Sequence, residues 1–335
     1  MSLTDLKFAE IGVAGELRAV WRTEFGRKIR MLAVPILALI ILVSVVDAIQ
    51  PLFISLRAVT AFASESSPML MLVMGESLVI LLGGIDLSIA MMASFAAVLM
   101  VIVGPSVGDF GIPLVLAVAG AIGALQGFIH CRAQIPSFVT SFGTSGILYG
   151  LTHYISNATA APLSEPSAII DFMGGRTFGT PNSIVIVGIC AAILAILFRV
   201  TRMGRHIYAI GASERAAKMA GVRTERVKLI VFAISSICAA IGGLLLLSQT
   251  LYSSPAMANN YILPAIVGVV VGGTAISGGV GGIACALVGG LIAAVVRVGT
   301  VVVGLNPAFQ NIVFGVVVLA AVALTIDRGK LGTIK

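Results

Sequence analysis

Two ionisable residues of this 335-residue chain lie inside long apolar runs, Glu76 in the run near 66–82 and Arg297 in the run near 282–304. An ionised side chain is costly at the depth of a lipid bilayer, so such a residue normally faces an opposite charge or a water-filled cavity. We hypothesise that Glu76 and Arg297 either pair with each other or line the path of a solute. Both alternatives indicate transport rather than covalent catalysis.

The residue sets that enzymes need do not occur in these runs, which contain no clustered acid, base, nucleophile or metal ligands. The sequence has no G-x-x-x-x-G-K-[ST] phosphate loop, and the glycines at 278–282 are not followed by Lys-Ser or Lys-Thr. We therefore expect a non-catalytic chain that binds no cofactor and no metal. If ATP drives the transport, another chain must hydrolyse it. The cysteines have no paired spacing that would predict a disulfide framework or a zinc site; they are Cys131, Cys190, Cys238 and Cys285.

The composition indicates that lipid is the solvent for most of the chain. Hydrophobic residues make up 59% of the sequence and charged residues 10%, and the mean hydropathy is +1.11. That leaves too little polar surface to cover a water-soluble globule. A bilayer core takes about 20 apolar residues per helix. We predict an all-α integral membrane protein of about ten transmembrane helices, near 31–49, 66–82, 87–103, 112–130, 137–155, 182–198, 229–250, 262–276, 282–304 and 308–326.

One predicted span is interrupted. The run 262–276 is short and contains Pro264, and the stretch 272–282 is rich in glycine, so we expect a broken or re-entrant segment near 262–282. The pair Gly272-Gly273 here resembles Gly83-Gly84 after the second span. This repetition suggests an internal duplication, although chance explains it almost as well in a chain with 38 glycines.

Basic residues give the chain an orientation, because cytoplasmic loops retain lysine and arginine. Of the 21 basic residues, 17 lie in three segments: six in 1–30, eight in 199–228 and three in 327–335. All three segments are therefore predicted to be cytoplasmic. The net charge of +7 lies at helix ends rather than on a surface suited to nucleic acid, so no nucleic-acid partner is expected.

The same reading divides the chain into a leader, a transmembrane domain at 31–326 with the cytoplasmic loop 199–228, and a tail at 327–335. Within the leader, 1–30, the spacing of Leu17 and Trp21 suits a helix on the inner leaflet, and a flexible polar segment is the alternative.

The cytoplasmic loop contains the most informative polar segment. Between its glycines, Ser213 can cap a short helix with Glu214 in the first turn and Lys218 in a later turn, an order of charges that stabilises a helix. A short, well-capped cytoplasmic helix suits the docking of a partner. The alternative is a solvated loop that only follows the distribution of positive charge.

Five blocks together resemble the permease subunits of bacterial ribose-type monosaccharide ABC importers, a family that also includes permeases for other pentoses, hexoses, polyols and an autoinducer furanose. The blocks occur in the family's order between about residue 70 and residue 326. They are Gly83–Ser88, Gln134–Thr144, Gly204–Gly221, Gly272–Thr274 with Gly278–Gly279, and Phe309–Val313.

The resemblance implies a homodimer or heterodimer of permease chains in the bacterial inner membrane. It further implies ATPase subunits that carry ATP and magnesium at the cytoplasmic face, and a periplasmic sugar-binding protein that delivers a monosaccharide or a related polyol or furanose. The loop would be the ATPase-coupling segment, with the candidate residues Gly204, Tyr208, Gly211, Ser213, Glu214, Ala217 and Gly221.

The translocation path is harder to assign from the sequence. Asp86 is expected to cap the third span after a turn, with a gating role as the alternative. The chain departs from the family's pattern at Ile262 and Pro264, which stand in place of an acidic pair, and this puts a simple copy of the ribose path in doubt. The candidate path residues are Glu76, Asp86, Arg297, Asn260 and Phe309.

An ion-coupled secondary transporter is the second hypothesis, with Glu76 as its coupling carboxylate. A lone buried carboxylate and an elaborate inner loop argue against it.

Overall fold

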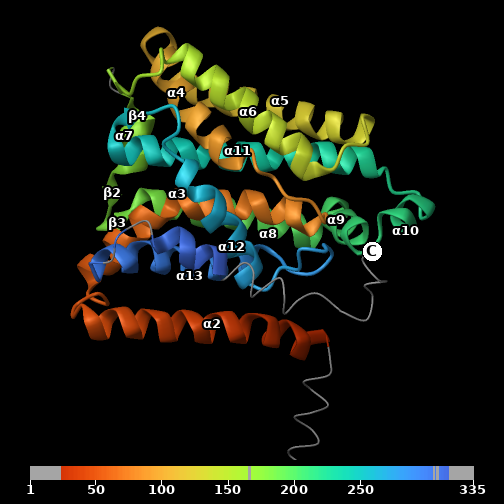
Figure 1. The fold of residues 1–335 in the computed structure, drawn as a ribbon, viewed down its shortest axis with the longest axis horizontal. Helices are drawn as coiled ribbons and strands as arrows, with labels where there is room; N and C mark the ends of the chain where they lie inside the picture. Colours follow the sequence, from red (N-terminus) through yellow and green to blue (C-terminus); the bar gives the residue numbers. More distant parts are fainter. Residues whose placement is uncertain (1–23, 165–166, 305, 307–308, 317–335) are drawn as a thin grey trace, which may run out of the picture.

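A computed structural model of the chain describes residues 24–164, 167–304, 306 and 309–316, and these residues form a bundle of long helices (Figure 1). The predicted helical fold is confirmed for the part of the chain that the structure describes. The long helices are α2 (Glu24–Ile49), α3 (Leu56–Leu81), α4 (Ile89–Val107), α5 (Gly111–Arg132), α6 (Ser137–Ile155), α8 (Asn182–Val200), α11 (Thr224–Thr250) and α13 (Ile283–Val302). The short helices are η1 (Gly108–Phe110), α7 (Ala168–Gly174), α9 (Arg202–Ala212), α10 (Glu214–Met219), η2 (Asn259–Tyr261) and α12 (Ile262–Val271).

Six helical segments of the described residues are long and apolar enough to cross a membrane. One of them, Ile89–Arg132, includes both α4 and α5, and α6 is long enough but is not in this set. Most of the predicted span at 308–326, most of the leader and the whole tail lie outside the described residues. Within that span, 309–316 is helical.

The predicted start of the second span, at 66, is wrong, because α3 begins at Leu56. Ser55 caps this earlier start, since its side chain accepts a hydrogen bond from the Ala58 amide at 3.3 Å. The apolar run begins late in the sequence because Arg57 and Glu65 lie in the first turns of the helix. Hydropathy alone therefore does not locate the first residue of a helix whose outer turns carry charged side chains.

The helices α3 and α11 form the centre of the bundle. Every residue from Ser66 to Leu81 of α3 is buried, and α3 packs against α8, α11, α12 and α13. Figure 1 shows α2 at one edge and α5 and α6 at the other. On α2 and α6, exposed apolar side chains such as Leu37 and Ile147 suit contact with lipid.

Small residues bring the central helices close together. A Cβ atom on Gly123 of α5 would overlap Ser236 and the Phe232 carbonyl of α11. A Cβ atom on Gly268 of α12 would lie 3.2 Å from the Cα of Gly290 in α13. Such close backbone approach is typical of helix packing in membranes, where van der Waals contact replaces the hydrophobic driving force.

The two glycine pairs end their helices with the same hydrogen-bonded turn. After α3, Gly83 has a φ of +82°, and after α12, Gly273 has a φ of +97°. Both turns show the paired bonds of a Schellman motif: Gly84 N to Val79 O (3.0 Å) with Gly83 N to Ile80 O (2.8 Å), and Thr274 N to Val269 O (3.2 Å) with Gly273 N to Val270 O (3.0 Å). After the second turn, no helix forms until Ile283, so the predicted break near 262–282 is present.

The two ends of the bundle carry different connections (Figure 1). One end has α7 and four short strands, and the other end has α9 and α10. The strands form two antiparallel pairs: β1 (Ala161–Pro162) with β4 (Tyr252–Ser253), and β2 (Arg176–Thr177) with β3 (Thr180–Pro181).

Candidate functional site

The segment 204–221 folds as two short capped helices. Thr201 caps α9 through its side chain, which accepts a hydrogen bond from the Gly204 amide at 3.4 Å. Ser213 caps α10, because its hydroxyl accepts a hydrogen bond from the Ala216 amide at 3.3 Å. The predicted cap at Ser213 is confirmed, whereas α9 itself was not predicted. Serine and threonine caps let such short helices form.

Glu214 ties α10 to the central helix α11. Its carboxylate contacts Lys218 of the same helix at 3.2 Å and Lys228 of α11 at 2.7 Å. Partial burial alone would raise the pKa of Glu214, but the hydrogen bonds and charges of Lys228 and Lys218 outweigh it, so the pKa lies below its ordinary value. Glu214 is therefore ionised at neutral pH and holds the start of α10 against α11.

Gly211 lies where α9 meets the glycine turn after α3 and the loop at Gly278–Gly279 before α13. The amide of Gly279 donates a hydrogen bond to the Leu81 carbonyl at 2.9 Å, which joins the end of α3 to the turn that precedes α13. A Cβ atom on Gly211 would overlap both the Leu81 oxygen and the Gly279 nitrogen. A Cβ atom on Gly278 would lie 2.7 Å from the Gly83 nitrogen. Three backbone segments therefore meet here without intervening side chains.

Tyr208 makes a second link between α9 and the same loop. Its hydroxyl donates a hydrogen bond to the Gly281 carbonyl at 2.9 Å, and its ring packs edge-on against Phe198 at 6.0 Å. Burial, with a smaller contribution from Cys285, raises the pKa of Tyr208. The phenol therefore keeps its proton and remains a hydrogen-bond donor at physiological pH.

The remaining loop residues have structural roles. Gly204 packs directly on the backbone of Phe198, Ala217 is buried, and Gly221 has a φ of +81° just after α10. The seven residues predicted for this loop are thus placed at caps, close contacts and turns.

A buried polar network lies behind the first glycine turn. Glu76 is fully buried, and its Oε1 accepts a hydrogen bond from the Asp86 amide at 3.1 Å. Asp86 Oδ1 accepts hydrogen bonds from the Ser88 amide at 3.0 Å and from Gln126 Nε2 at 3.1 Å. The second oxygen of Asp86 lies 3.4 Å from the Ser235 hydroxyl. Residues from α3, α5 and α11 thus meet at one turn.

The prediction that Asp86 caps the third span is wrong. The residue before α4 is Ser88, and Asp86 instead accepts the amide two residues along the chain, as in an Asx turn. Ser137 and Ser141 of α6 hold the neighbouring residues, because their hydroxyls accept hydrogen bonds from the Ile85 amide at 3.1 Å and the Leu87 amide at 3.0 Å.

The hypothesised pair of Glu76 and Arg297 is also wrong. Arg297 of α13 instead contacts Glu65 of α3 at 3.2 Å, and its guanidinium lies 4.6 Å from the centre of the Tyr261 ring. A cation above an aromatic face adds to the stability of the pair. Glu76 lies in the same helix as Glu65 but further along it, within the buried network described above.

The two other candidate path residues are exposed. Asn260 lies in η2 next to Tyr261, and Phe309 begins the helical stretch 309–316. Gln310, which follows Phe309, donates a hydrogen bond to the Arg297 carbonyl at 2.9 Å. The five predicted path residues therefore divide into an inner group, Glu76 and Asp86, and a group around Arg297.

A cavity of about 300 Å³ lies between the first glycine turn and the 204–221 loop. Its walls include Gly83 and Gly84 of the turn, Ser137 of α6, and the ion-paired Glu214 and Lys228. The turn at Gly83-Gly84, the start of α6 and the 204–221 segment are far apart in the sequence and are neighbours in space. Among the residues that the structure describes, no group of three or more potential ligands could hold a metal ion.

Several residues of the site could not be found from the sequence. Gln126 and Ser235 complete the network around Asp86, and Glu65 and Tyr261 complete the contacts of Arg297. The available signal was a polar residue within an apolar run, which Gln126 provides. The sequence gives no signal for its partners, because the helix packing alone decides them.

Comparison with known proteins gives a consistent family. Residues 58–322 match the family described as branched-chain amino acid transport system permease component. The chain is 31% identical over 292 residues to the ribose import permease protein of Escherichia coli strain K12, with 86% of this chain and 91% of the relative covered.

Two further relatives extend this likeness. The ribose import permease protein of Bacillus subtilis strain 168 is 30% identical over 303 residues, with 88% and 92% covered. The D-allose transport system permease protein of Escherichia coli strain K12 is 30% identical over 290 residues, with 85% and 89% covered. No solved structure gives a significant match.

Proposed function

Because this chain belongs to the family of branched-chain amino acid transport permease components and is a permease subunit of a sugar ABC importer, we propose that it moves a monosaccharide, or a related polyol or furanose, across the bacterial inner membrane. The chain would supply the passage and its partners the energy. It would bind no cofactor of its own.

The observation that carries the coupling proposal is the backbone junction at Gly211. A force applied to α9 would reach the end of α3 at Leu81 and the loop before α13 at Gly279, because the backbones are in contact there without a side chain between them. Closely packed segments move together rather than deforming. The helices α9 and α10 would dock on an ATPase subunit that carries ATP and magnesium, and closure of that subunit would shift both turns.

The charge distribution supports an orientation for the chain, and its helices support a span count. The segment 199–228 carries eight of the 21 basic residues, so α9 and α10 would face the cytoplasm. With α6, α12 and the stretch that includes 309–316 added to the apolar helices, the chain would cross or enter the membrane about ten times. The opposite end, with α7 and the short strands, would then receive the periplasmic sugar-binding protein.

A second permease chain would pack on α6. A Cβ atom on Gly143, Gly146 or Gly150 would meet nothing within 4 Å, so this side of α6 is open. Exposed glycines spaced three and four residues apart allow two membrane helices to approach closely. The exposed aromatic residues Tyr149 and Tyr154 on the same helix could contact a sugar at such an interface.

Reconstituted uptake tests this function. The permease, its ATPase and the binding protein would be placed in proteoliposomes and supplied with labelled sugars. We expect uptake that requires ATP in the lumen and all the partner proteins, and that is unchanged by proton or sodium gradients. Uptake that ignores ATP but follows an ion gradient would reject the proposal.

A further inference from the structure

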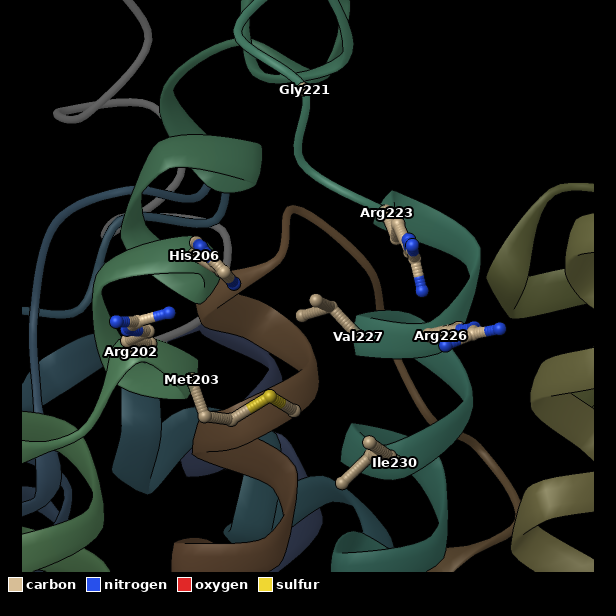
Figure 2. A pocket seen from close by; sticks show the side chains of 8 residues that line it. All are labelled: Arg202, Met203, His206, Gly221, Arg223, Arg226, Val227 and Ile230. Atoms are coloured by element: carbon tan, nitrogen blue, oxygen red, sulfur yellow. The ribbon is translucent and has the colours of Figure 1, made fainter.

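A second cavity, of about 460 Å³, lies between α9 and the start of α11, apart from the junction at Gly211 (Figure 2). Figure 2 shows Met203 and Val227 pointing toward each other across the space between the two helices. With Ile230 they form an apolar floor. A volume of several hundred Å³ is in the range of cavities that hold small organic groups.

The rim of this cavity is basic. Arg202 and His206 line it from α9, and Arg223 and Arg226 line it from the beginning of α11 and the residue before it. In Figure 2 the Arg226 side chain extends to the side of α11 away from α9. None of the described residues that line the cavity is acidic. None of the three arginines has an ion pair or side-chain hydrogen bond to any residue that the structure describes. Guanidinium groups without a protein partner suit a phosphate, which they bind through several hydrogen bonds.

The position of the cavity along the chain places it at a membrane boundary. Arg202 follows directly on the end of the apolar helix α8 at Val200, and Arg223 immediately precedes α11. Val200 and Ile230 are exposed apolar residues, which suits contact with acyl chains. The basic rim therefore lies where lipid headgroups meet the ends of two spans.

We propose that this cavity binds the headgroup of an anionic phospholipid from the inner leaflet, with the phosphate at the arginines and the glycerol and upper acyl chain on the apolar floor. Basic cavities between helices on the cytoplasmic side are suited to such lipids. The inference rests on the proposed cytoplasmic position of α9. A bound lipid would fill the space between α9 and α11 and so set the position of the coupling helix.

Native mass spectrometry of the detergent-purified, full-length permease tests the proposal. The protein is titrated with phosphatidylglycerol or with phosphatidylcholine of the same acyl chains, and the lipid-bound fraction gives an apparent affinity. The test variant is Arg202→Gln/Arg223→Gln/Arg226→Gln. The matched control, Arg199→Gln/Arg205→Gln/Arg215→Gln, removes the same charge from exposed arginines outside the cavity.

We expect wild type to prefer phosphatidylglycerol and the test variant to bind it about a hundred-fold more weakly, at roughly 1 kcal/mol per arginine. The control should stay within a few-fold of wild type. An equal loss in both triple variants would mean general attraction to the basic face, and no loss in either would mean that the cavity takes no lipid. Both results overturn the proposal.

The experiment also distinguishes two other partners for the arginines, a soluble phosphate compound and the ATPase subunit. Glycerol phosphate without acyl chains should not raise the thermal stability of wild type as phosphatidylglycerol does; equal stabilisation would identify a soluble phosphate compound instead. If the test variant keeps its lipid but no longer retains the ATPase subunit on an affinity column, the arginines are a protein contact. Either result overturns lipid binding.

The binding assay needs neither ATP nor sugar. If lipid binding fails while ATP-driven uptake is intact, only this inference is rejected. If lipid binds but uptake does not depend on ATP, only the proposed function is rejected. If the triple variant does not fold, the single variants Arg202→Gln and Arg223→Gln are measured in the same way. The comparison of the two lipids on wild type requires no variant.

Discussion

Gly211 of α9 and Gly279 of the loop before α13 pack backbone against backbone, and the Gly279 amide is in turn bonded to the Leu81 carbonyl at 2.9 Å. Substitution Gly211→Ala places a methyl group into these atoms. Overpacking of this kind costs about 1–3 kcal/mol. We expect a lower melting temperature and a loss of ATP-driven uptake, with the ATPase still bound.

Gly188→Ala is the matched control for this substitution. Gly188 lies within α8, and a Cβ atom there would meet nothing within 4 Å. Alanine is the better helix former by about 1 kcal/mol, so this variant should be as stable as wild type or more stable. If both alanine variants behave alike in the uptake assay, the junction at Gly211 does not couple the helices.

The pair of Arg297 and Glu65 predicts a charge-swap result. Arg297→Glu alone puts two acids together and leaves Tyr261 without its cation, so we expect reduced thermal stability. The Glu65 side chain is 53% exposed, so the pair itself contributes no more than about 1 kcal/mol. The double variant Glu65→Arg/Arg297→Glu should recover part of the loss.

A charge swap between Glu76 and Arg297 is the control for the swap between Glu65 and Arg297. Since Glu76 does not contact Arg297, the swap Glu76→Arg/Arg297→Glu should be more damaging than either single change. Recovery in that double variant would contradict the contacts described here. Melting curves of the purified variants in one detergent measure all of these differences.

Much of the fold could be predicted because apolar length and glycine position are local properties. The long helices, the break after α12 and the Ser213 cap all follow from short stretches of sequence. The start of α3 could not be predicted from hydropathy, because Arg57 and Glu65 lie in its outer turns.

The site was harder to predict, because its contacts join distant parts of the chain. Asp86 is held by Gln126 and by Glu76, and Arg297 by Glu65, and each partner depends on which helix packs against which. The charge of a residue in an apolar run indicates that a partner exists, and only the packing of the helices identifies that partner. Glu76 and Arg297 are the two unusual charges of the apolar runs, and each is held by neighbours from its own surroundings rather than by the other.

The open side of α6 predicts that Gly146→Leu weakens association between permease chains. A Cβ atom there meets no described atom within 4 Å, so we expect the monomer to keep its melting temperature. The leucine would, however, separate two helices that approach through glycine. Light scattering on detergent-purified protein should show fewer dimers. Gly188→Leu on α8 is the control, and an equal effect of both changes would argue against α6 as the interface.

The ion pairs of Glu214 predict how stability depends on pH. The pKa of Glu214 is lowered by Lys228 and Lys218 against the effect of burial, so its stabilising contribution is complete above the ordinary carboxyl range and is lost as the pH falls through the lowered pKa. The side chain is 38% exposed, so Glu214→Gln should cost no more than about 1 kcal/mol at pH 7.

That difference between wild type and Glu214→Gln should therefore shrink as the pH falls below the ordinary carboxyl range and through the lowered pKa of Glu214, where the carboxyl takes up a proton. Thermal unfolding at a series of pH values measures it. Glu225→Gln is the control, because Glu225 has no ion pair within the part of the chain that the structure describes. If the stability difference between wild type and Glu214→Gln grew as the pH falls, the ionised carboxylate of Glu214 would not be the stabilising form.

Glu76 separates the ABC importer from an ion-coupled transporter. Its Oε1 accepts the Asp86 amide at 3.1 Å, while Oε2 has no partner among the described residues. Glu76→Gln keeps the acceptor and removes the titratable group, so ATP-driven uptake should persist. Glu76→Ala removes the acceptor and leaves both a cavity and an unpaired amide, which should cost about 2–5 kcal/mol. Uptake and melting temperature, measured on both variants, decide the role: a coupling carboxylate would lose transport in Glu76→Gln at unchanged stability, whereas a structural acceptor loses both only in Glu76→Ala.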